Sequence, residues 1–345
     1  MLESFYRRNA ERLSWPPGTL FINAPCAWGC EQAKSGYQFF TQDYCDYKTL
    51  RDAGLMVEFG CFPAHGPARF HDVVIAAPRE KSHLEQWLHW ASTIGPETRV
   101  WLAGENRAGI KSAARRIRTF FSEVGQADAA RHCVMWRAQA PMPGPEFDVR
   151  KIFSKWSVQW HPQNLEVVSA PGVFSHGRLD PATAMLLEVL NKLPLRGDIL
   201  DFGCGSGVLG LGIKSTHPEV DLHCADVSAL ALESCRQSLS LNGHSANVMA
   251  SCGFKDIEFR FDMIVSNPPF HRGVVTQSDM SMKMLGELGI NCKAGGQLVI
   301  VANRHLAYPE WMDKTFGGHE VLKSNNKYAV YRGIPRHGER GVKPK

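Results

Sequence analysis

The tetrapeptide Asn267-Pro268-Pro269-Phe270 follows a mostly apolar run and carries groups that together could hold a planar amine. Two consecutive prolines can neither continue a strand ladder nor lie inside a helix, so the chain must turn there. The side-chain carbonyl of Asn267 and the backbone carbonyl of Pro268 could each accept one hydrogen of an exocyclic amine. Phe270 could stack on the ring that bears the amine. The turn therefore predicts an amine-binding corner closed by an aromatic side chain.

The chemistry that suits such a corner is alkylation of the amine. A ring-conjugated amine is a poor nucleophile because its lone pair is delocalised, whereas the methyl group of a sulfonium is a potent electrophile. The main task is then to place the nitrogen in line with the methyl carbon. Two acceptors favour the charge-bearing nitrogen of the transition state over the flat ground state, which raises the rate. Asn267, Pro268 and Phe270 are thus the candidate catalytic residues, and neither a metal nor a covalent intermediate is required.

A glycine-rich stretch, DFGCGSGVLG, supplies the second group of candidate residues. Glycines after a strand let the backbone approach a ligand closely and leave helix N-terminal amides free for its polar groups. The G-x-G-x-x-G of nicotinamide enzymes fits the same stretch, which alone does not identify the cofactor. An acidic residue that closes the next strand binds ribose hydroxyls, or else caps a helix. The candidate cofactor-binding residues here are Asp201, Gly203, Gly205, Gly207 and Asp226.

Alternating strand and helix patterns place both groups at one edge of a sheet. The pattern predicts strands at 198–203 and 221–226 and in ANVMAS, FDMIVS and GQLVIVAN, and helices from near Gly207, over 229–241 and around 279–291. Such alternation indicates a doubly wound parallel sheet, whose carboxyl-terminal edge carries Asp201, Asp226 and Asn267. The last two strands, 319–324 and 328–333, are joined by three residues, which forces an antiparallel hairpin. A parallel sheet that ends in a hairpin favours the class I methyltransferase architecture over a plain dinucleotide-binding domain.

The chain has 345 residues, enough for two domains. We place a linker at 141–150, between domains 1–140 and 151–345. Helix and central strand are excluded there by Pro141, Pro143, Gly144 and Pro145.

The two halves show signs of an internal duplication. HDVVIAAPREK (71–81) aligns with FDMIVSNPPFH, so that Asp72 meets Asp262 and Ala77 meets Asn267. In this alignment the first half keeps the scaffold and lacks the groups for chemistry. The alternative is two unrelated α/β domains that share generic strands.

The composition limits the function classes. The net charge of +5 is modest and compatible with a polyanionic partner. The N-terminal stretch MLESFYRRNAERLS has no apolar signal-peptide core, and no uncharged apolar run reaches about 18 residues, so secretion and membrane spanning are not expected. Ten cysteines lack a framework or zinc-site spacing and are interpreted as reduced thiols. We therefore expect a cytoplasmic protein without a bound metal, a membrane contact or an obligate protein partner.

The NPPF corner, with DFGCGSG upstream, resembles the N-P-P-[FYW] signature of amino methyltransferases. A longer set of stretches resembles RsmC-type small-subunit ribosomal RNA guanine-N2 methyltransferases over nearly the whole chain: APGVFSHGRLD, FDMIVSNPPFH, IVANRHL and FGGHEVL, and in the first half GENRAGIKSA and ARHC. The resemblance implies two tandem class I methyltransferase-like (Rossmann-like) α/β domains, of which the second is catalytic. It also implies S-adenosylmethionine as methyl donor, one guanine of 16S ribosomal RNA as acceptor, and the assembled 30S subunit as substrate.

Three segments complete the expected cofactor site. After the third strand the family carries an Asn or Asp for the adenine amine, whereas this chain has Ser251 and Cys252, so a backbone amide could serve instead. In GVFSHGRLD, Phe174 and Ser175 could line the cofactor entrance. Asp180 either lies there too or caps the following helix.

Basic residues of the first half are candidates for RNA contact. A helical pattern places Lys111, Arg115 and Arg118 opposite an apolar stripe. A merely solvated surface would look the same. The stripe is Ile110, Ala114, Ile117, Phe121 and Val124, and the candidate RNA-contacting residues are Pro269, Arg107, Lys111, Arg115, Arg116 and Arg118.

Other functions stay open from the sequence. Large-subunit (23S) guanine-N2 methyltransferases share the layout, and ANRHL and NNK resemble theirs equally well. A protein glutamine-amide methyltransferase would use the same corner but should lack a silent duplicate domain with basic helices. An inactive RNA-binding assembly factor is disfavoured because Asn267 is intact beside Ala77. A nicotinamide oxidoreductase would share only the glycine pattern.

Overall fold

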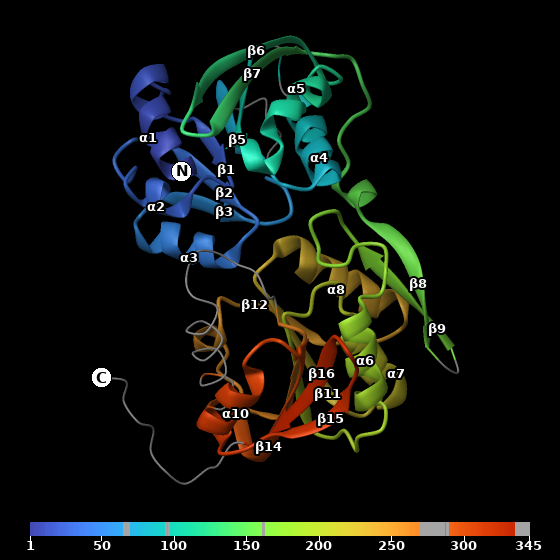
Figure 1. The fold of residues 1–345 in the computed structure, drawn as a ribbon. Coiled ribbons are helices and arrows are strands. Elements are labelled where there is room, and N and C mark those ends of the chain that lie inside the picture. Colours follow the sequence, from blue (N-terminus) through green and yellow to red (C-terminus); the bar gives the residue numbers. More distant parts are fainter. Residues whose placement is uncertain are drawn as a thin grey trace. The chain divides into compact units, whose positions relative to one another are not determined.

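The computed structural model describes residues 1–64, 70–93, 95, 97–160, 163–268, 287 and 290–334. They form two compact units, Met1–Phe153 and Ser154–Lys345, each built around its own seven-stranded sheet (Figure 1). Residues 142–148 form neither helix nor strand. The helix expected around 279–291 falls almost entirely outside the described residues.

The first unit has a sheet of strand order β3-β2-β1-β4-β5-β7-β6. Strands β1 to β5 are parallel, and β7 lies antiparallel between β5 and β6. Helices α1, α2 and α3 lie on one face of the sheet and α4 and α5 on the other (Figure 1). The strands are β1 (Leu20–Ile22), β2 (Gln38–Thr41), β3 (Met56–Phe59), β4 (Asp72–Ala76), β5 (Arg99–Glu105), β6 (Phe121–Ala130) and β7 (Cys133–Pro141). The helices are α1 (Leu2–Leu13), α2 (Cys26–Cys30), α3 (Tyr44–Asp52), α4 (Lys81–Ser92) and α5 (Ile110–Ile117).

The second unit repeats this arrangement in the order β12-β11-β10-β13-β14-β16-β15, with a separate antiparallel pair, β8 and β9. The expected C-terminal hairpin is confirmed, because β16 pairs antiparallel with both β14 and β15. The strands are β8 (Ser154–Trp160), β9 (Gln163–Ser169), β10 (Asp198–Phe202), β11 (Asp221–Asp226), β12 (Asn247–Ala250), β13 (Phe261–Ser266), β14 (Cys292–Asn303), β15 (Glu320–Ser324) and β16 (Tyr328–Gly333). The helices are α6 (Pro181–Leu190), α7 (Val208–Thr216), α8 (Ala229–Leu241) and α10 (Tyr308–Phe316).

Both faces of the second sheet are buried, which explains why its central strands are apolar without alternation. Ile199 of β10 belongs to an apolar cluster with residues of α6, α7 and α8, whereas the next residue, Leu200, joins a cluster with residues of α10. Val265 and Ile264 of β13 divide between the two clusters in the same way. Neighbouring side chains of a strand point to opposite faces, so each strand helps to fill two cores.

The two sheets have the same strand order, so the repeated architecture that the duplication predicts is confirmed, and the duplication itself stays a prediction. The aligned aspartates also make equivalent contacts. Asp72 begins β4 and pairs with Arg99 of β5 at 2.5 Å, and Asp262 of β13 pairs with Lys293 of β14 at 2.7 Å.

Two local expectations were wrong. Pro141 is the last residue of β7, where we expected no central strand. It pairs only with Phe121 of β6, because the pairing of β7 with β5 ends at Ala138, so the missing N–H leaves no gap in that ladder. The apolar stripe of α5 ends at Ile117, and the residues beyond it, Phe121 and Val124, lie in β6.

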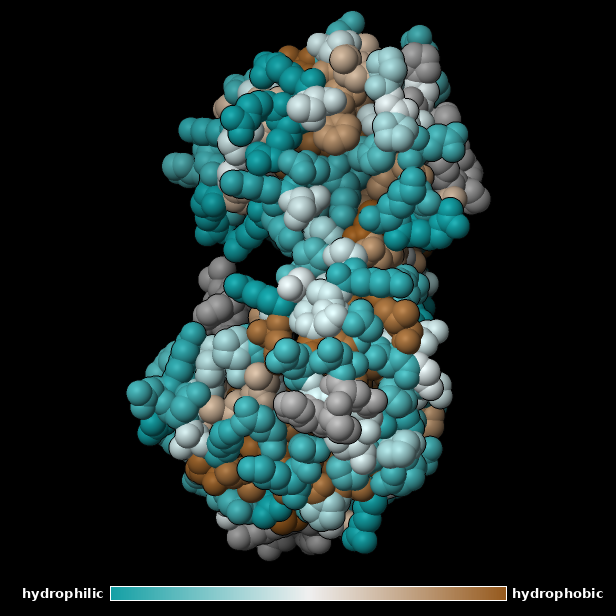
Figure 2. All heavy atoms as spheres, turned by 90° about the vertical axis from the view of Figure 1, so that its right-hand side faces the viewer, coloured by the Kyte–Doolittle hydropathy of each residue, from teal (hydrophilic) through white to brown (hydrophobic). Residues whose placement is uncertain are grey.

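One face of each unit is mostly polar (Figure 2). On the face drawn in Figure 2, hydrophilic side chains cover most of both units and hydrophobic ones form small groups. Among the described helices, none has the length and apolar character needed to cross a membrane.

Candidate active site

The glycine loop between β10 and α7 is built from backbone conformations that favour glycine. Gly203, Gly205 and Gly207 have φ values of +74°, +54° and +81°. A Cβ atom at Gly207 would also lie 2.8 Å from Sγ of Cys235, whereas Cβ atoms at Gly203 and Gly205 would enter open space. The loop is therefore packed on the α8 side at Gly207 and bare at Gly203 and Gly205, which lets a ligand approach the backbone.

Asp226 fixes this loop to the end of β11. Its carboxylate accepts the backbone N–H of Gly205 at 3.0 Å and that of Ser228, the N-cap of α8, at 2.9 Å. The helix cap considered for Asp226 is thus formed by Ser228 instead. The carboxylate is half-buried beside the loop, where a ribose would have to lie in the cofactor-binding interpretation.

Asp201 lies beneath the loop. Its side chain is fully buried, and Oδ2 accepts the backbone N–H of Gly210 in α7 at 3.2 Å. Burial raises the pKa of the Asp201 carboxyl well above its usual range. In this position Asp201 supports the start of α7 from below.

Asn267 is held by the first turn of α6. Its Nδ2 group donates to Oδ2 of Asp180 at 3.1 Å and to Oγ1 of Thr183 at 2.9 Å. A carboxylate only accepts hydrogen bonds, so the amide NH₂ faces Asp180 and the carbonyl oxygen of Asn267 points away from it. Asp180 also caps α6 by accepting the N–H of Thr183 at 2.9 Å, which confirms the helix-cap interpretation, and its place at a cofactor entrance stays a prediction.

A pocket brings these segments together. Asn267 lines it with the glycine loop and with the segment before α6, which contributes Phe174, Ser175 and Asp180. The Phe174 side chain is 65% exposed at this place, and Ser175 has a φ of +57°. Pro268, the next candidate, is buried, and Pro269 and Phe270 lie outside the described residues.

The segment after β12 differs from expectation. Ser251 is buried, its N–H donates to the carbonyl of Asp226, and its hydroxyl donates to the carbonyl of Gly253. The N–H of Cys252 donates to Oδ2 of Asp256 at 2.8 Å, so this amide is engaged within the protein.

The sequence analysis missed Asp256 and Thr183. An acidic residue shortly after the third strand was the available signal for Asp256, and the Asp-Pro-x-Thr start of α6 was the signal for Thr183.

The structure bears on two further expectations, which concern the cysteines and a metal site. The expected reduced thiols are confirmed for eight cysteines, at positions 26, 30, 61, 133, 204, 224, 235 and 292. Within the described ranges, no group of three or more His, Cys, Asp and Glu side chains is placed to hold a metal ion.

The basic residues of the first unit divide into two groups. Lys111, Arg115 and Arg118 are exposed on and just after α5. Arg107 pairs with Glu105 at 2.5 Å and Arg116 pairs with Glu85 at 2.9 Å, so these two cations are partly neutralised.

The first unit lacks the features that form the pocket of the second. Its β1 leads into the short helix α2 instead of a glycine loop, and Trp28 of α2 is fully buried against Phe21. Ala77 stands where the second unit has Asn267.

Comparisons with known proteins assign the chain to a family. Residues 164–332 match the family model "Methyltransferase small domain", and residues 22–156 match "Methyltransferase small domain N-terminal". Proteins named ribosomal RNA small subunit methyltransferase C are similar over most of both chains. The one from Shewanella pealeana is 35% identical over 77% of this chain and 77% of its own, and the one from Aliivibrio fischeri is 34% identical over 85% and 86%. The chain belongs to the ribosomal RNA small subunit methyltransferase C family.

A solved structure of the ribosomal RNA small subunit methyltransferase C family agrees in fold. The T. thermophilus 16S rRNA N2 methyltransferase (RsmC), in complex with AdoMet and guanosine, has a TM-score of 0.83 at 23% identity. The match covers 92% of this chain and 88% of that one, so both units share the fold.

Proposed function

We propose that this protein transfers a methyl group from S-adenosylmethionine to the exocyclic N2 of a guanine in small-subunit (16S) ribosomal RNA. The observation that carries the proposal is the orientation of Asn267, whose amide carbonyl is turned away from Asp180 beside the glycine loop. Family membership supports the donor and the class of RNA.

The glycine loop fits a cofactor. Gly203 and Gly205 leave the backbone bare, and Asp226 beside them is positioned for ribose hydroxyls. Phe174 and Ser175 would line the entrance, and Asp256 is a candidate for the adenine amine in place of the side chains of Ser251 and Cys252. When bound, S-adenosylmethionine supplies the electrophilic methyl group.

The chain's own residues would act on the guanine amine. The Asn267 carbonyl and the backbone carbonyl of Pro268 would accept the two N2 hydrogens and direct the nitrogen lone pair to the methyl carbon. Phe270 would stack on the guanine, with Pro269 next to it. The surplus proton would leave to solvent, because an alkylated aryl-type ammonium is strongly acidic.

The first unit would select the RNA. It carries the exposed cations Lys111, Arg115 and Arg118, whereas the ion pairs of Arg107 and Arg116 leave these two less available. We take the substrate to be the assembled 30S subunit in the cytoplasm, and the domain division 1–140 and 151–345 to separate RNA selection from catalysis.

The experiment is transfer of radiolabelled methyl groups to small subunits, large subunits and naked RNAs that lack their own modifications. We expect N2-methylguanine in small-subunit RNA with the wild type and a loss of at least about a hundredfold with Asn267→Ala, as for removal of a preorganised transition-state hydrogen bond. Asn247→Ala, an exposed change at the start of β12, is the matched control and should stay active.

Label confined to large-subunit RNA would move the enzyme to the 23S class. Absence of label in any RNA, despite bound S-adenosylmethionine, would favour a protein amide substrate or an inactive assembly factor.

A further inference from the structure

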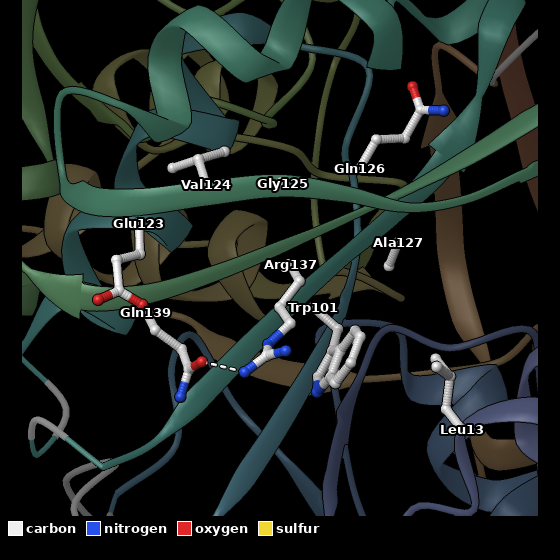
Figure 3. A pocket seen from close by; sticks show the side chains of 9 residues that line it. All are labelled: Leu13, Trp101, Glu123, Val124, Gly125, Gln126, Ala127, Arg137 and Gln139. Atoms are coloured by element: carbon white, nitrogen blue, oxygen red, sulfur yellow. Dashed lines mark hydrogen bonds between the residues drawn. The ribbon is translucent and has the colours of Figure 1, made fainter.

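The first unit has a pocket on the outer part of its sheet, away from the position of its lost cofactor loop. The pocket has a volume of about 520 Å³ and lies on one face of the β6–β7 hairpin, next to the end of α1 (Figure 3). Its lining includes Leu13 of α1, Trp101 of β5, Arg137 and Gln139 of β7, and the β6 stretch 123–127.

Arg137 lies at the centre of this pocket, between Trp101 and the β6 stretch (Figure 3). The register places it opposite Trp101 on one side and Gly125 on the other. Its guanidinium lies over the Trp101 ring, 5.8 Å from the ring centroid. Trp101 is buried, and its indole N–H donates to Asp72 at 2.7 Å, so the ring is a rigid support. Arg137 itself is exposed, and a planar group can stack on it.

Gly125 leaves room beside this guanidinium. A Cβ atom at Gly125 would meet no atom within 4 Å. A glycine inside a strand weakens the strand and marks a place where another group approaches the backbone closely. Gly125 directly precedes an irregularity in the pairing at Gln126 and Asp128, and it leaves the strand open to a ligand beside Arg137.

Polar groups stand at the edge of this flat surface. Glu123 and Gln139 face each other across β6 and β7. Gln139 accepts a hydrogen bond from Arg137 through Oε1, as Figure 3 shows, so its NH₂ group is the part of this amide that can donate to a ligand. A carboxylate acceptor and an amide donor side by side can bind the polar edge of a planar ring.

The charge around the pocket suits a ligand that carries phosphate. Arg8 and Arg12 of α1 both pair with Asp128 of β6, at 3.0 and 2.6 Å, and remain about half exposed. Together with Arg137 and Glu123, these residues make a group of three arginines and two carboxylates, so the net charge of the group is positive.

We propose that this pocket binds an unpaired base of the ribosomal RNA substrate, stacked on Arg137 above Gly125, with its edge at Glu123 and Gln139. The inference rests on the proposed function and names where the first unit would read the RNA. Stacking on an arginine plane and hydrogen bonding at the base edge is a general mode of single-stranded RNA recognition. A purine fits best because it offers the larger stacking surface.

The test uses the full chain and two fluorescent oligomers of equal length, oligo(A) and an abasic chain with the same phosphates. Gly125→Val fills the open space without a clash and replaces glycine by a good strand former, so the fold should be kept. Arg137→Lys keeps the charge and removes the planar stacking surface. Arg131→Lys, at the exposed tip of the same hairpin, is the matched control.

We expect the wild type to bind oligo(A) at least about tenfold more tightly than the abasic chain, as for one stacked base. Gly125→Val and Arg137→Lys should each lose about tenfold on oligo(A) and little on the abasic chain, and Arg131→Lys should bind like the wild type. Wild-type affinity of both pocket variants for oligo(A), or equal losses on both oligomers, would overturn the proposal.

A methyl-transfer assay of the same variants shows whether a failure concerns this inference or the proposed function. If the wild type is active and both pocket variants have an unchanged KM for small-subunit RNA, the proposal of a base-binding pocket is contradicted and the proposed function is not. Wild type that binds oligo(A) through the pocket and methylates no RNA would contradict the proposed function alone.

Discussion

Asn267, the proposed catalytic residue, shows how a side chain gains its orientation from residues far away in the chain. The NPPF motif predicted its position, because prolines fix the turn after a strand. Its partners, Asp180 and Thr183, precede it by 87 and 84 residues. The Asp-Pro-x-Thr spacing marks Asp180 and Thr183 as the start of a helix, but it carries no information about their contacts with Asn267.

The contact from Thr183 can be removed without a change of shape. We expect Thr183→Val to lower kcat about two- to tenfold, because one hydrogen bond that orients the Asn267 amide is lost, a contribution of about 0.5–1.5 kcal/mol. The affinity for S-adenosylmethionine should stay the same. Thr183→Ser, which keeps the hydroxyl, is the control. Equal kcat for both variants would mean that the hydroxyl serves only the start of α6.

At the scale of elements, the glycine loop and the C-terminal hairpin were predictable, and the end of α5 was not. Positive φ values and a short connection leave clear marks in the sequence. Residues Arg118, Thr119 and Phe120, which separate α5 from β6, include no glycine or proline to mark the change. The apolar residues at 121 and 124 continue the helical spacing by chance, and the pairing of β6 with β7, a contact with a separate segment, decides their structure.

Two substitutions distinguish backbone strain from side-chain packing at the glycine loop. The free energy of unfolding of Gly207→Ala should be lower than that of the wild type by more than about 1–2 kcal/mol. The substitution adds a clash with Cys235 to the cost of a left-handed backbone conformation. It should also weaken binding of S-adenosylmethionine. Gly243→Ala, at a φ of +72° in open space after α8, should show the strain alone and bind the cofactor normally. Chemical denaturation and cofactor titration measure both effects, and equal losses in the two variants would refute a packing role for Gly207.

At the scale of the whole molecule, the chain combines a unit that keeps the site residues with one that keeps only the sheet. The alignment of Asp72 with Asp262 predicted the shared strand order from a few residues. Exposed cations on the first unit were also predictable, but the sequence could not show that Arg116 faces a carboxylate, because Glu85 lies on α4, in a separate segment.

The exposed cations define a prediction for RNA binding. Replacing Lys111, Arg115 and Arg118 together by Gln should raise the KM for small-subunit RNA and reduce the slope of log affinity against log salt concentration by up to about 2. The affinity for S-adenosylmethionine should not change. A control with Lys34, Arg79 and Lys81 replaced by Gln removes the same charge from other exposed positions of the first unit. An identical salt slope in the two triple variants would refute a specific role of the α5 region.

The ion pairs Asp72–Arg99 and Asp262–Lys293 sit where their parallel strands begin, at the edge of each sheet opposite to the one that carries Asn267 and Ala77. Each unit can therefore serve as a structural control for the other. A feature that both units share, such as this ion pair, is explained by the sheet alone. A feature that only the second unit has, such as Asn267 beside a glycine loop, needs an explanation beyond the sheet.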